Sequence, residues 1–353
     1  MPPIDTQTRR RHFLKWISAS PLLAAPGMRA LAAPQCIASP QAARSVFDFE
    51  PVCRNNVPPA HFEYMASGVD DKIILCANRE ALLACELEPP HLSGALNLHT
   101  RMEIFGTRYA SPICLAPTGG NTAYHPDGEL AVARAARAAN HLSMLAAGAT
   151  ASIDDVIAAR GGPMWYQLYA ASSWVVARAL AGQAEAAGAQ AVVVTLNGGR
   201  DGSQSTHWDF VRRLRDTTPM RMVLKGILTA EDAALAVQHG VDGIIVSNHG
   251  GHGGHGEGSG TIDALPAVIA AVNDRLPVLI DGGFRRGSDV VKALAMGARG
   301  VCIGRPYLWG LGAFGQAGVE RVLELLRIET RAAMQQCGER SIKDLNASFV
   351  RKH

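Results

Sequence analysis

The sequence has few aromatic side chains, little net charge and no long apolar run. Aromatic residues make up 6% of its 353 residues and no basic stretch is interleaved with them, which argues against stacking on nucleic-acid bases. Lys and Arg number 34 against 31 Asp and Glu, and a net charge of +3 is too small to indicate a nucleic-acid partner. No apolar run reaches the roughly 18–20 residues that cross a bilayer, so we expect no membrane span.

Paired cysteine motifs are also missing. The chain has 7 cysteines but no CxxC pair, so neither structural zinc nor thioredoxin-like chemistry has support. Cys114 and Cys302 fall inside apolar runs, where cysteine is usually a small core residue. A Cys76–Cys85 disulfide is permitted if the protein is exported, but the sequence does not establish one.

Residues 1–33 have the pattern of an export signal. Arg9–Lys15 is basic, Pro21–Ala25 is weakly apolar, and Ala30–Ala33 resembles an A-x-A cleavage site. The stretch Arg10–Lys15 (RRHFLK) is similar to the twin-arginine signal of bacteria, which predicts a periplasmic protein. A basic, disordered N-terminus is the alternative.

From Pro112 onward, short apolar runs alternate with Ala-rich amphipathic segments. The expected strands are Ile113–Ala116, Leu142–Ala147, Met164–Tyr169, Ala191–Leu196, Met222–Lys225, Gly243–Ser247, Val278–Asp281 and Gly300–Ile303. The expected helices are 128–140, 152–160, 173–187, 206–215, 229–239, 264–275, 287–297 and 317–336. Eight strands, each followed by a helix, predict an α/β fold, a (β/α)8 TIM barrel over 112–348. Near-continuous apolar strands suit a parallel sheet that is covered on both faces.

An N-terminal extension, 34–111, precedes the barrel. Its first part, 34–60, lacks clear periodicity, and a helical piece is expected from Ala60 to Glu86. Within the barrel, Ser152, Thr229 and Ser288 precede acidic residues and are expected to cap helices. A doubly wound sheet is the alternative fold, but its GxGxxG turn is missing.

Polar residues follow most of the apolar runs, and in a barrel the chemistry collects where strands end. They are Pro117-Thr118, Gln167 with Tyr169, Thr195 with Asn197, Lys225, Ser247-Asn248-His249, Asp281-Gly282-Gly283 and Gly304-Arg305. Loops with glycines after the seventh and eighth strands, Asp281–Arg285 and Gly304–Pro306, predict a phosphate site to which Arg305 adds a bidentate contact. Simple turn-forming glycines are the alternative.

Lys225 and His249 are the candidate reactive residues. A buried ammonium group at a strand end needs an anionic or electron-rich partner, so Lys225 fits a phosphate, a flavin or a Schiff base. His249 follows the sixth strand, and a histidine there can act as a base near neutral pH. Its loop also carries His252 and His255, which suit either a metal site or a solvated loop. Because no Asp or Cys joins these histidines, we expect no metal.

Several motifs together resemble the FMN-dependent α-hydroxy acid dehydrogenase/oxidase family, which includes glycolate oxidase and lactate oxidase. The resemblance covers roughly 44–348. It rests on Leu224–Ala233 (LKGILTAEDA), Ile244–Gly251, Thr261–Pro266 (TIDALP), Asp281–Pro306, Tyr64–Gly68 (YMASG), Ala116–Gly119 (APTG) and Gln167–Tyr169.

The resemblance implies FMN as the cofactor and His249 as the base that takes a proton from the substrate. The implied FMN-binding residues are Pro117, Thr118, Gly119, Gln167, Thr195, Lys225, Ser247, Asp281, Gly282, Gly283, Arg285, Gly304 and Arg305. Tyr64 and Tyr169 would contact the substrate, with ordinary half-buried packing as the alternative. The partners are a small-molecule substrate and an electron acceptor, which is oxygen, a quinone or a cytochrome, and a homo-tetramer is the assembly by analogy.

The chain departs from the family pattern on the substrate side. His252 stands where the family has an arginine that binds the substrate carboxylate, and a histidine offers a weaker, pH-dependent charge. Asn197 replaces the aspartate that orients the base, and Gln204 lies near the place of a second arginine. Gly148 replaces a bulky residue and Ala146 a flavin-contacting serine, and the connection from Thr195 to Lys225 is short.

Three functions are therefore open. The first is oxidation of an α-hydroxy acid, and the second is oxidation of a larger, non-carboxylate alcohol or amine with the same FMN and His249. The third is a non-catalytic flavin-binding protein, against which the retention of Lys225 and His249 argues.

Overall fold

Eight parallel strands form the centre of the fold. The structure, a computed structural model, describes residues 36–68, 70–88, 95–170, 173–196, 207–252 and 258–352. The strands are β4 (Ile113–Leu115), β5 (Met144–Ala146), β6 (Trp165–Tyr169), β7 (Ala191–Thr195), β8 (Arg221–Ile227), β9 (Gly243–Val246), β10 (Val278–Ile280) and β11 (Gly300–Ile303). They pair in the order β4-β11-β10-β9-β8-β7-β6-β5, and a parallel bridge between Leu115 and Ser143 closes the ring. The predicted (β/α)8 fold is confirmed.

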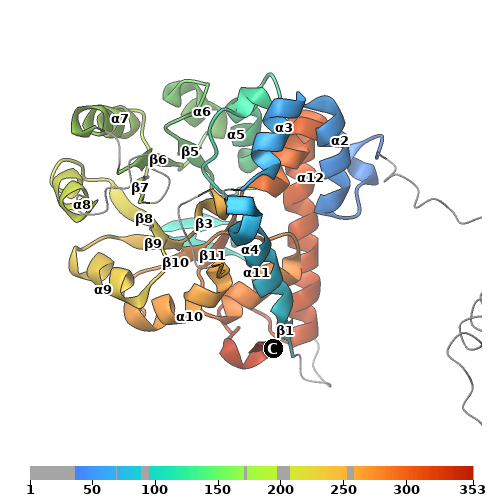
Figure 1. The fold of residues 1–353 in the computed structure, drawn as a ribbon. Helices are drawn as coiled ribbons and strands as arrows, with labels where there is room; N and C mark the ends of the chain where they lie inside the picture. The colour runs from blue at the N-terminus through green and yellow to red at the C-terminus, as the bar shows by residue number, and fades with distance from the viewer. Residues whose placement is uncertain are drawn as a thin grey trace, which may run out of the picture. The chain divides into compact units, whose positions relative to one another are not determined.

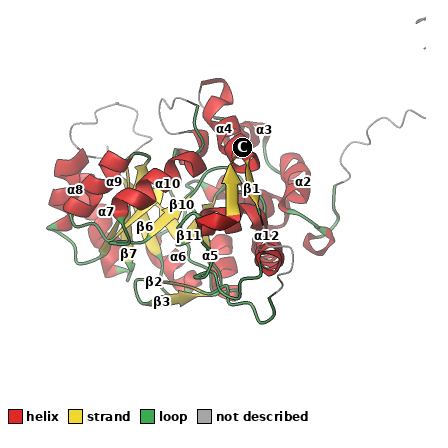
Figure 2. Ribbon diagram, turned by 90° about the horizontal axis from the view of Figure 1, so that it is seen from below, coloured by secondary structure: helices red, strands yellow, loops and turns green. Residues whose placement is uncertain are grey.

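Helices surround this ring (Figures 1 and 2). They are α5 (Gly128–Ala138), α6 (Ile153–Arg160), α7 (Trp174–Ala186), α8 (His207–Arg215), α9 (Ala230–Gln238), α10 (Thr261–Val272), α11 (Gly287–Ala295) and α12 (Arg305–Cys337). Ser152 and Thr229 accept the expected capping hydrogen bonds, from the backbone N–H groups of Asp155 and Asp232. Ser288 instead lies inside α11, whose start is held by the Asp289 carboxylate on the backbone N–H of Arg286. None of the described helices is long and apolar enough to cross a membrane.

Each barrel strand is buried on both faces, as the apolar runs predicted. Residues that point into the barrel, such as Cys114, Trp165 and Leu279, form one core with the hairpin of β2 (Met102–Ile104) and β3 (Thr107–Tyr109). That hairpin therefore closes the barrel interior at the end opposite the strands' carboxyl ends. Residues that point outward pack under the helices in a second, larger core.

The described part of the N-terminal extension contains the α-helices α2 (Phe49–Asn56), α3 (Pro59–Ala66) and α4 (Ile73–Ala84). The expected single helix from Ala60 to Glu86 is wrong, because Asp71 (φ 56°) and Lys72 (φ 66°) adopt left-handed backbone conformations that interrupt it. Beyond α4, β1 (Cys85–Leu87) pairs antiparallel with β12 (Val350–Lys352), so the described C-terminal end of the chain lies beside the extension (Figure 1).

The last helix is longer than predicted. Rather than starting at 317, α12 begins at Arg305 and is kinked at Phe314 and Gly315, where the backbone leaves helical geometry. The kink brings the backbones of Gly310 and Gly318 so close that a Cβ at Gly318 would lie 2.0 Å from the Gly310 carbonyl oxygen. Glycine is required there, and glycines have low helix propensity, which explains why the pattern was missed. In Figure 1, α12 runs alongside α2.

Short 3-10 helices complete the described elements: Pro40–Ala42, Val46–Asp48, Asp70–Lys72, Asn121–Ala123, His249–Gly251 and Ala347–Phe349. From Ile37 onward the described residues pack as one unit.

Candidate active site

A cavity of about 310 Å³ lies at the carboxyl ends of the barrel strands, within the size range of small-molecule sites. The predicted residues that line it are Tyr64, Pro117, Thr118, Gly119, Tyr169, Lys225, His249, His252, Asp281, Gly282, Gly283, Arg285, Gly304 and Arg305. Gln167, Thr195 and Ser247 are buried just behind this lining. The Gln167 amide donates to the Thr195 hydroxyl at 3.0 Å, and Thr195 pairs in register with Lys225.

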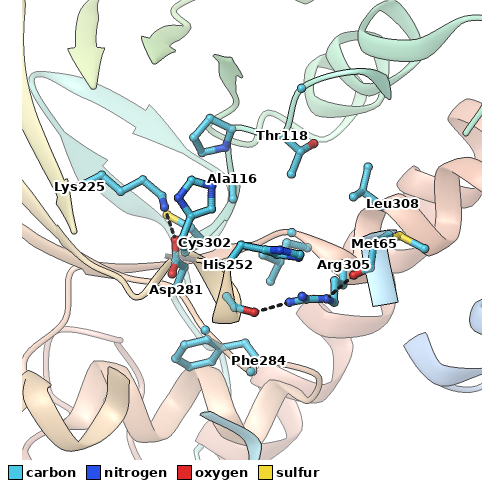
Figure 3. A pocket seen from close by; sticks show the side chains of 18 of the residues that line it. Met65, Ala116, Thr118, Lys225, His252, Asp281, Phe284, Cys302, Arg305 and Leu308 are labelled. Atoms are coloured by element: carbon cyan, nitrogen blue, oxygen red, sulfur yellow. Dashed lines mark hydrogen bonds and ion pairs between the residues drawn. The ribbon is translucent and has the colours of Figure 1, made fainter. Parts of the chain in front are cut away.

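A buried ion pair forms the floor of the cavity (Figure 3). The Lys225 ammonium lies 3.2 Å from the Asp281 carboxylate and donates to the Ser247 hydroxyl at 2.8 Å. Ser247 in turn donates to Asp281 at 2.7 Å, and also accepts the backbone N–H of His249 at 3.1 Å. The cost of burying the lysine is therefore offset by a carboxylate and a hydroxyl.

The loop that carries His249 has an unusual backbone. His249 (φ 57°), Gly250 (φ 63°) and Gly251 (φ 94°) are successive left-handed residues, a backbone conformation that is uncommon and costly for a residue other than glycine. Gly250 lies against the Arg305 guanidinium and Gly251 against the backbone of Leu75, where a Cβ would be 2.9 Å and 3.0 Å from its neighbours. The His249 ring is nearly parallel to that of Tyr169, with centroids 6.2 Å apart.

Arginines line the opposite part of the cavity. All three donor nitrogens of the Arg305 guanidinium bond to main-chain carbonyls, of Met65 at 2.7 Å, Gly250 at 2.8 Å and Ser67 at 2.7 Å. Arg285 stacks 4.7 Å from the centre of the Trp309 ring. Burial, together with the positive charges of Arg305 and Arg79, lowers the pKa of Arg285 to about 9.

The mouth of the cavity carries tyrosines and His252. The His252 ring stacks on that of the exposed Tyr64 at 5.3 Å, and Figure 3 shows it close to Arg305. Burial and the nearby Arg305 charge lower the pKa of His252, so its imidazole is neutral at neutral pH. Burial likewise raises the pKa of Tyr169, and it raises the pKa of Tyr124 to about 12 with help from Tyr64. These phenols are therefore neutral hydrogen-bond donors.

Comparison with known proteins identifies the family. The family model described as FMN-dependent dehydrogenase matches residues 53–202 and 197–352. The chain belongs to this family. It is 35% identical to glycolate oxidase of Spinacia oleracea over 351 residues, 87% of this chain and 95% of the relative. It is 34% identical to L-lactate oxidase of Lysinibacillus sphaericus over 356 residues, 87% of this chain and 92% of the relative. A crystal structure of mandelate oxidase with 3,3-difluoro-2-hydroxy-3-phenylpropionic acid superposes with a TM-score of 0.81 at 37% identity, covering 88% of this chain and 99% of that one.

Membership in the FMN-dependent dehydrogenase family makes FMN the cofactor of this enzyme, and the residues around the cavity fit it. Burial in the first place, and the charges of Arg305 and Arg79 in the second, lower the pKa of Arg285, and a bound phosphate dianion would stabilise the charged guanidinium against both effects. Gly282 (φ 105°) and Gly283 (φ 82°) adopt backbone conformations that favour glycine. The N-termini of α11 and α12, which can bind an anion, follow the two glycine loops of this part of the cavity. Arg285 and these loops would hold the FMN phosphate. Lys225, at the floor of the cavity, would be the buried cation near the flavin ring.

Further lining residues were not among the predicted site residues, although Met65, Ala116, Gly250 and Phe284 lie in predicted motifs: Met65, Ala116, Tyr124, Gly250, Phe284, Cys302, Ile303 and Leu308. Leu308 lies in the part of α12 that the helix pattern missed, and Cys302 points inward from β11 next to the floor. Its partner in register is Cys114, and both are free buried thiols, as are Cys53, Cys85 and Cys337. Cys76 and Cys85 are also unpaired with each other.

Besides His252, the structure describes two of the residues that the sequence analysis predicted to differ from the family, Ala146 and Gly148. Ala146 ends β5 and is buried, whereas a Cβ at Gly148 would meet nothing closer than the Gly119 Cα at 3.9 Å. The Gly148 carbonyl explains why residue 119 is a glycine, because a Cβ at that position would lie 2.7 Å from the carbonyl oxygen. Asn197, Gln204 and His255 lie outside the described residues, as does the segment 1–33.

Replacing Arg285 tests the phosphate site. We expect Arg285→Leu to weaken FMN binding by about 10-fold or more, because a charge-assisted hydrogen bond contributes roughly 1.5–3 kcal/mol. The measurement is FMN titration of the apoprotein by fluorescence quenching. Arg286→Leu is the matched control, since the Arg286 guanidinium pairs with Glu329 at 2.9 Å and does not line the cavity. Equal FMN affinities of the two variants would contradict this assignment.

Proposed function

We propose that the enzyme oxidises an α-hydroxy acid to the 2-oxo acid, with His249 as the base. The proposal rests on one observation. A single cavity is lined by His249, by the Lys225–Asp281 ion pair and by the two arginines Arg285 and Arg305. A base, a cation next to the flavin ring and an anchor for the flavin phosphate are what such a reaction needs at one place.

The chain's own residues would act as follows. His249 takes the proton that the substrate loses when its α-carbon is oxidised, and the constrained loop keeps the imidazole beside the Tyr169 ring. Tyr64 and Tyr169 line the cavity and donate hydrogen bonds to the substrate's polar oxygens, and the raised pKa of Tyr169 keeps its phenol protonated for this role. When bound, FMN supplies a two-electron acceptor, and Lys225 is the cation suited to stabilise negative charge on it.

The comparisons favour the hydroxy acid over a larger alcohol or amine, because the relatives are named for glycolate, lactate, 2-hydroxyacids and mandelate. We place the substrate at the bulkier end of this class. The sequence supports this, because glycine at 148 stands where the family is expected to carry a bulky residue, and His252 offers a carboxylate a neutral donor at neutral pH instead of a fixed charge.

We further propose that the protein is exported to the periplasm by the twin-arginine pathway and hands its electrons to oxygen, a quinone or a cytochrome. The sequence of residues 1–33 supports the export. That pathway carries folded proteins, which suits an enzyme that binds its cofactor before it crosses the membrane. The homo-tetramer stays a prediction by analogy.

Substitution of the base tests the reaction. We expect His249→Gln to slow reduction of the bound flavin by the hydroxy acid about 10²–10⁴-fold, the usual contribution of a general base. Stopped-flow absorbance under anaerobic conditions measures the rate, with the flavin content as a control for intact cofactor binding. A variant that reduces its flavin as fast as the wild type would rule out His249 as the base.

The pH dependence of substrate binding tests His252. A bound carboxylate favours the imidazolium, so binding takes up a proton, and affinity should fall as pH rises above the lowered pKa of the free enzyme. His252→Arg should remove this dependence and lower KM near pH 8 about 10-fold, because it restores a permanent charge. KM values of both enzymes across pH 5–9 decide the question, and parallel profiles would exclude a role for His252.

Export is tested by replacing both arginines of the signal with lysine (Arg10→Lys with Arg11→Lys). We expect the full-length protein to stay in the cytoplasm of a bacterial host, because the pathway's receptor reads the arginine pair. Fractionation of the host cells, with immunodetection of the chain, is the measurement. Equal periplasmic amounts of the two proteins would contradict the proposal.

A further inference from the structure

Asn78, in the middle of α4, is a buried polar residue outside the cavity lining. Its side chain is 1% exposed and takes part in three hydrogen bonds. The Asn78 amide nitrogen donates to the Asn248 side-chain oxygen at 2.8 Å, and the Asn248 amide nitrogen donates back at 2.9 Å. The backbone N–H of Thr261 adds a third bond to the Asn78 oxygen at 3.0 Å. A reciprocal amide pair of this kind fixes both side chains in orientation as well as in distance.

The partner of Asn78 is the residue directly before His249. Asn248 is itself 3% exposed, and the left-handed backbone begins one residue later, at His249. A strained conformation of this kind persists only where its surroundings overdetermine it. Three contacts constrain this loop. The Ser247 hydroxyl accepts the His249 N–H, Arg305 donates to the Gly250 carbonyl, and Asn78 of α4 bonds to Asn248.

The same helix also touches the phosphate loop. A Cβ at Gly282 would lie 2.9 Å from the Asn78 side-chain oxygen, and a Cβ at Gly283 would lie 2.6 Å from its carbonyl oxygen. Arg79, the next residue, donates to the Gly283 carbonyl at 3.3 Å and pairs with Asp289. One turn of α4 thus contacts both the loop of the base and the loop of the cofactor phosphate.

We propose that Asn78 is a positioning residue, which holds the loop of His249 in its reactive conformation through the Asn78–Asn248 amide pair. The proposal rests on the proposed function, since it assigns Asn78 to the placement of the base. It makes the N-terminal extension a working part of the active site, although Asn78 and His249 are 171 positions apart in the sequence.

Removing either amide should release the loop. Alanine at 78 leaves the two amide atoms of Asn248 and the Thr261 N–H buried without these bonds, and buried polar groups then seek other partners by moving. A displacement of the base of about 1 Å can reduce a reaction rate on the order of 100-fold. The affinity for substrate should change less than the rate, because Tyr64 and Tyr169 lie outside the released loop and the His252 ring, within it, also stacks on the Tyr64 ring.

The experiment compares Asn78→Ala, Asn248→Ala, the double variant and a control, each purified with bound FMN. The control is Asn56→Ala, which removes an amide that joins α2 to the Gly312 and Ala313 carbonyls of α12, at 3.3 and 3.0 Å, and not to the base loop. We expect each single variant to lose roughly 10–100-fold in the anaerobic rate of flavin reduction, with KM within about threefold. The double variant should lose no more than a single one, because the two amides act as one unit.

A second readout does not depend on turnover. Hydrogen–deuterium exchange of the backbone amides of 247–252 should become faster in Asn78→Ala and stay unchanged in Asn56→Ala. If Asn78→Ala does not fold, Asn78→Asp serves instead, because it keeps the shape and the acceptor for Thr261 but loses the donor to Asn248. It should give the same fall in rate and the same faster exchange.

Unchanged exchange and an unchanged rate in a folded, flavin-loaded variant would overturn the proposal, as would additive losses in the double variant. Failure of the proposed function looks different. In that case hydroxy acids would not reduce the flavin of the wild type either, while the exchange of 247–252 would still decide whether Asn78 holds the loop.

Discussion

The hydroxyl of Ser247 is the contact on which the active site depends. It accepts a hydrogen bond from Lys225, donates one to Asp281 and accepts the backbone N–H of His249. One small side chain at the end of β9 thereby joins three neighbouring strands of the barrel and the residue proposed as the base. Because each partner is buried or half-buried, water competes little for these hydrogen bonds. They therefore position the Lys225–Asp281 pair and the loop of His249 together. The Asn78–Asn248 pair adds a second fixed point to the same loop from outside the barrel.

Much of the barrel could be predicted from the sequence because its signals are local. Strands such as Ala191–Thr195 are continuous apolar runs, and helices such as α6 start at a serine whose side chain caps them. The parts that were missed depend on distant contacts. The first turns of α12 are rich in glycine, whose need arises only from the approach of Gly310 to Gly318. The break between α3 and α4 rests on left-handed Asp71 and Lys72, which no periodicity indicates.

The site itself was predictable to the extent that it is built from strand ends. A parallel barrel brings all of these ends to one face, so the polar residues that follow the apolar runs meet around one cavity. Residues that reach the cavity from elsewhere were not predictable in this way. Tyr124 comes from a loop, Leu308 from α12, and Asn78 acts through Asn248 from a helix whose sequence shows no chemical motif. Arg305 stays a predicted phosphate contact that lines the cavity, and its bonds to the carbonyls of Met65, Ser67 and Gly250, which no sequence pattern indicates, join three segments there.

The residues that fit FMN and the residues proposed to contact the substrate line the same cavity. Tyr64, Tyr169 and His252 line the cavity together with His249, and the pKa shifts of Tyr169 and His252 leave both side chains uncharged at neutral pH. The most direct test is anaerobic mixing of the flavin-loaded protein with L-lactate, glycolate and mandelate while the visible absorption of the flavin is followed. We expect at least one of them to bleach the flavin, with mandelate the fastest because we place the substrate at the bulkier end of the hydroxy acids. A flavin that none of these hydroxy acids bleaches would contradict it.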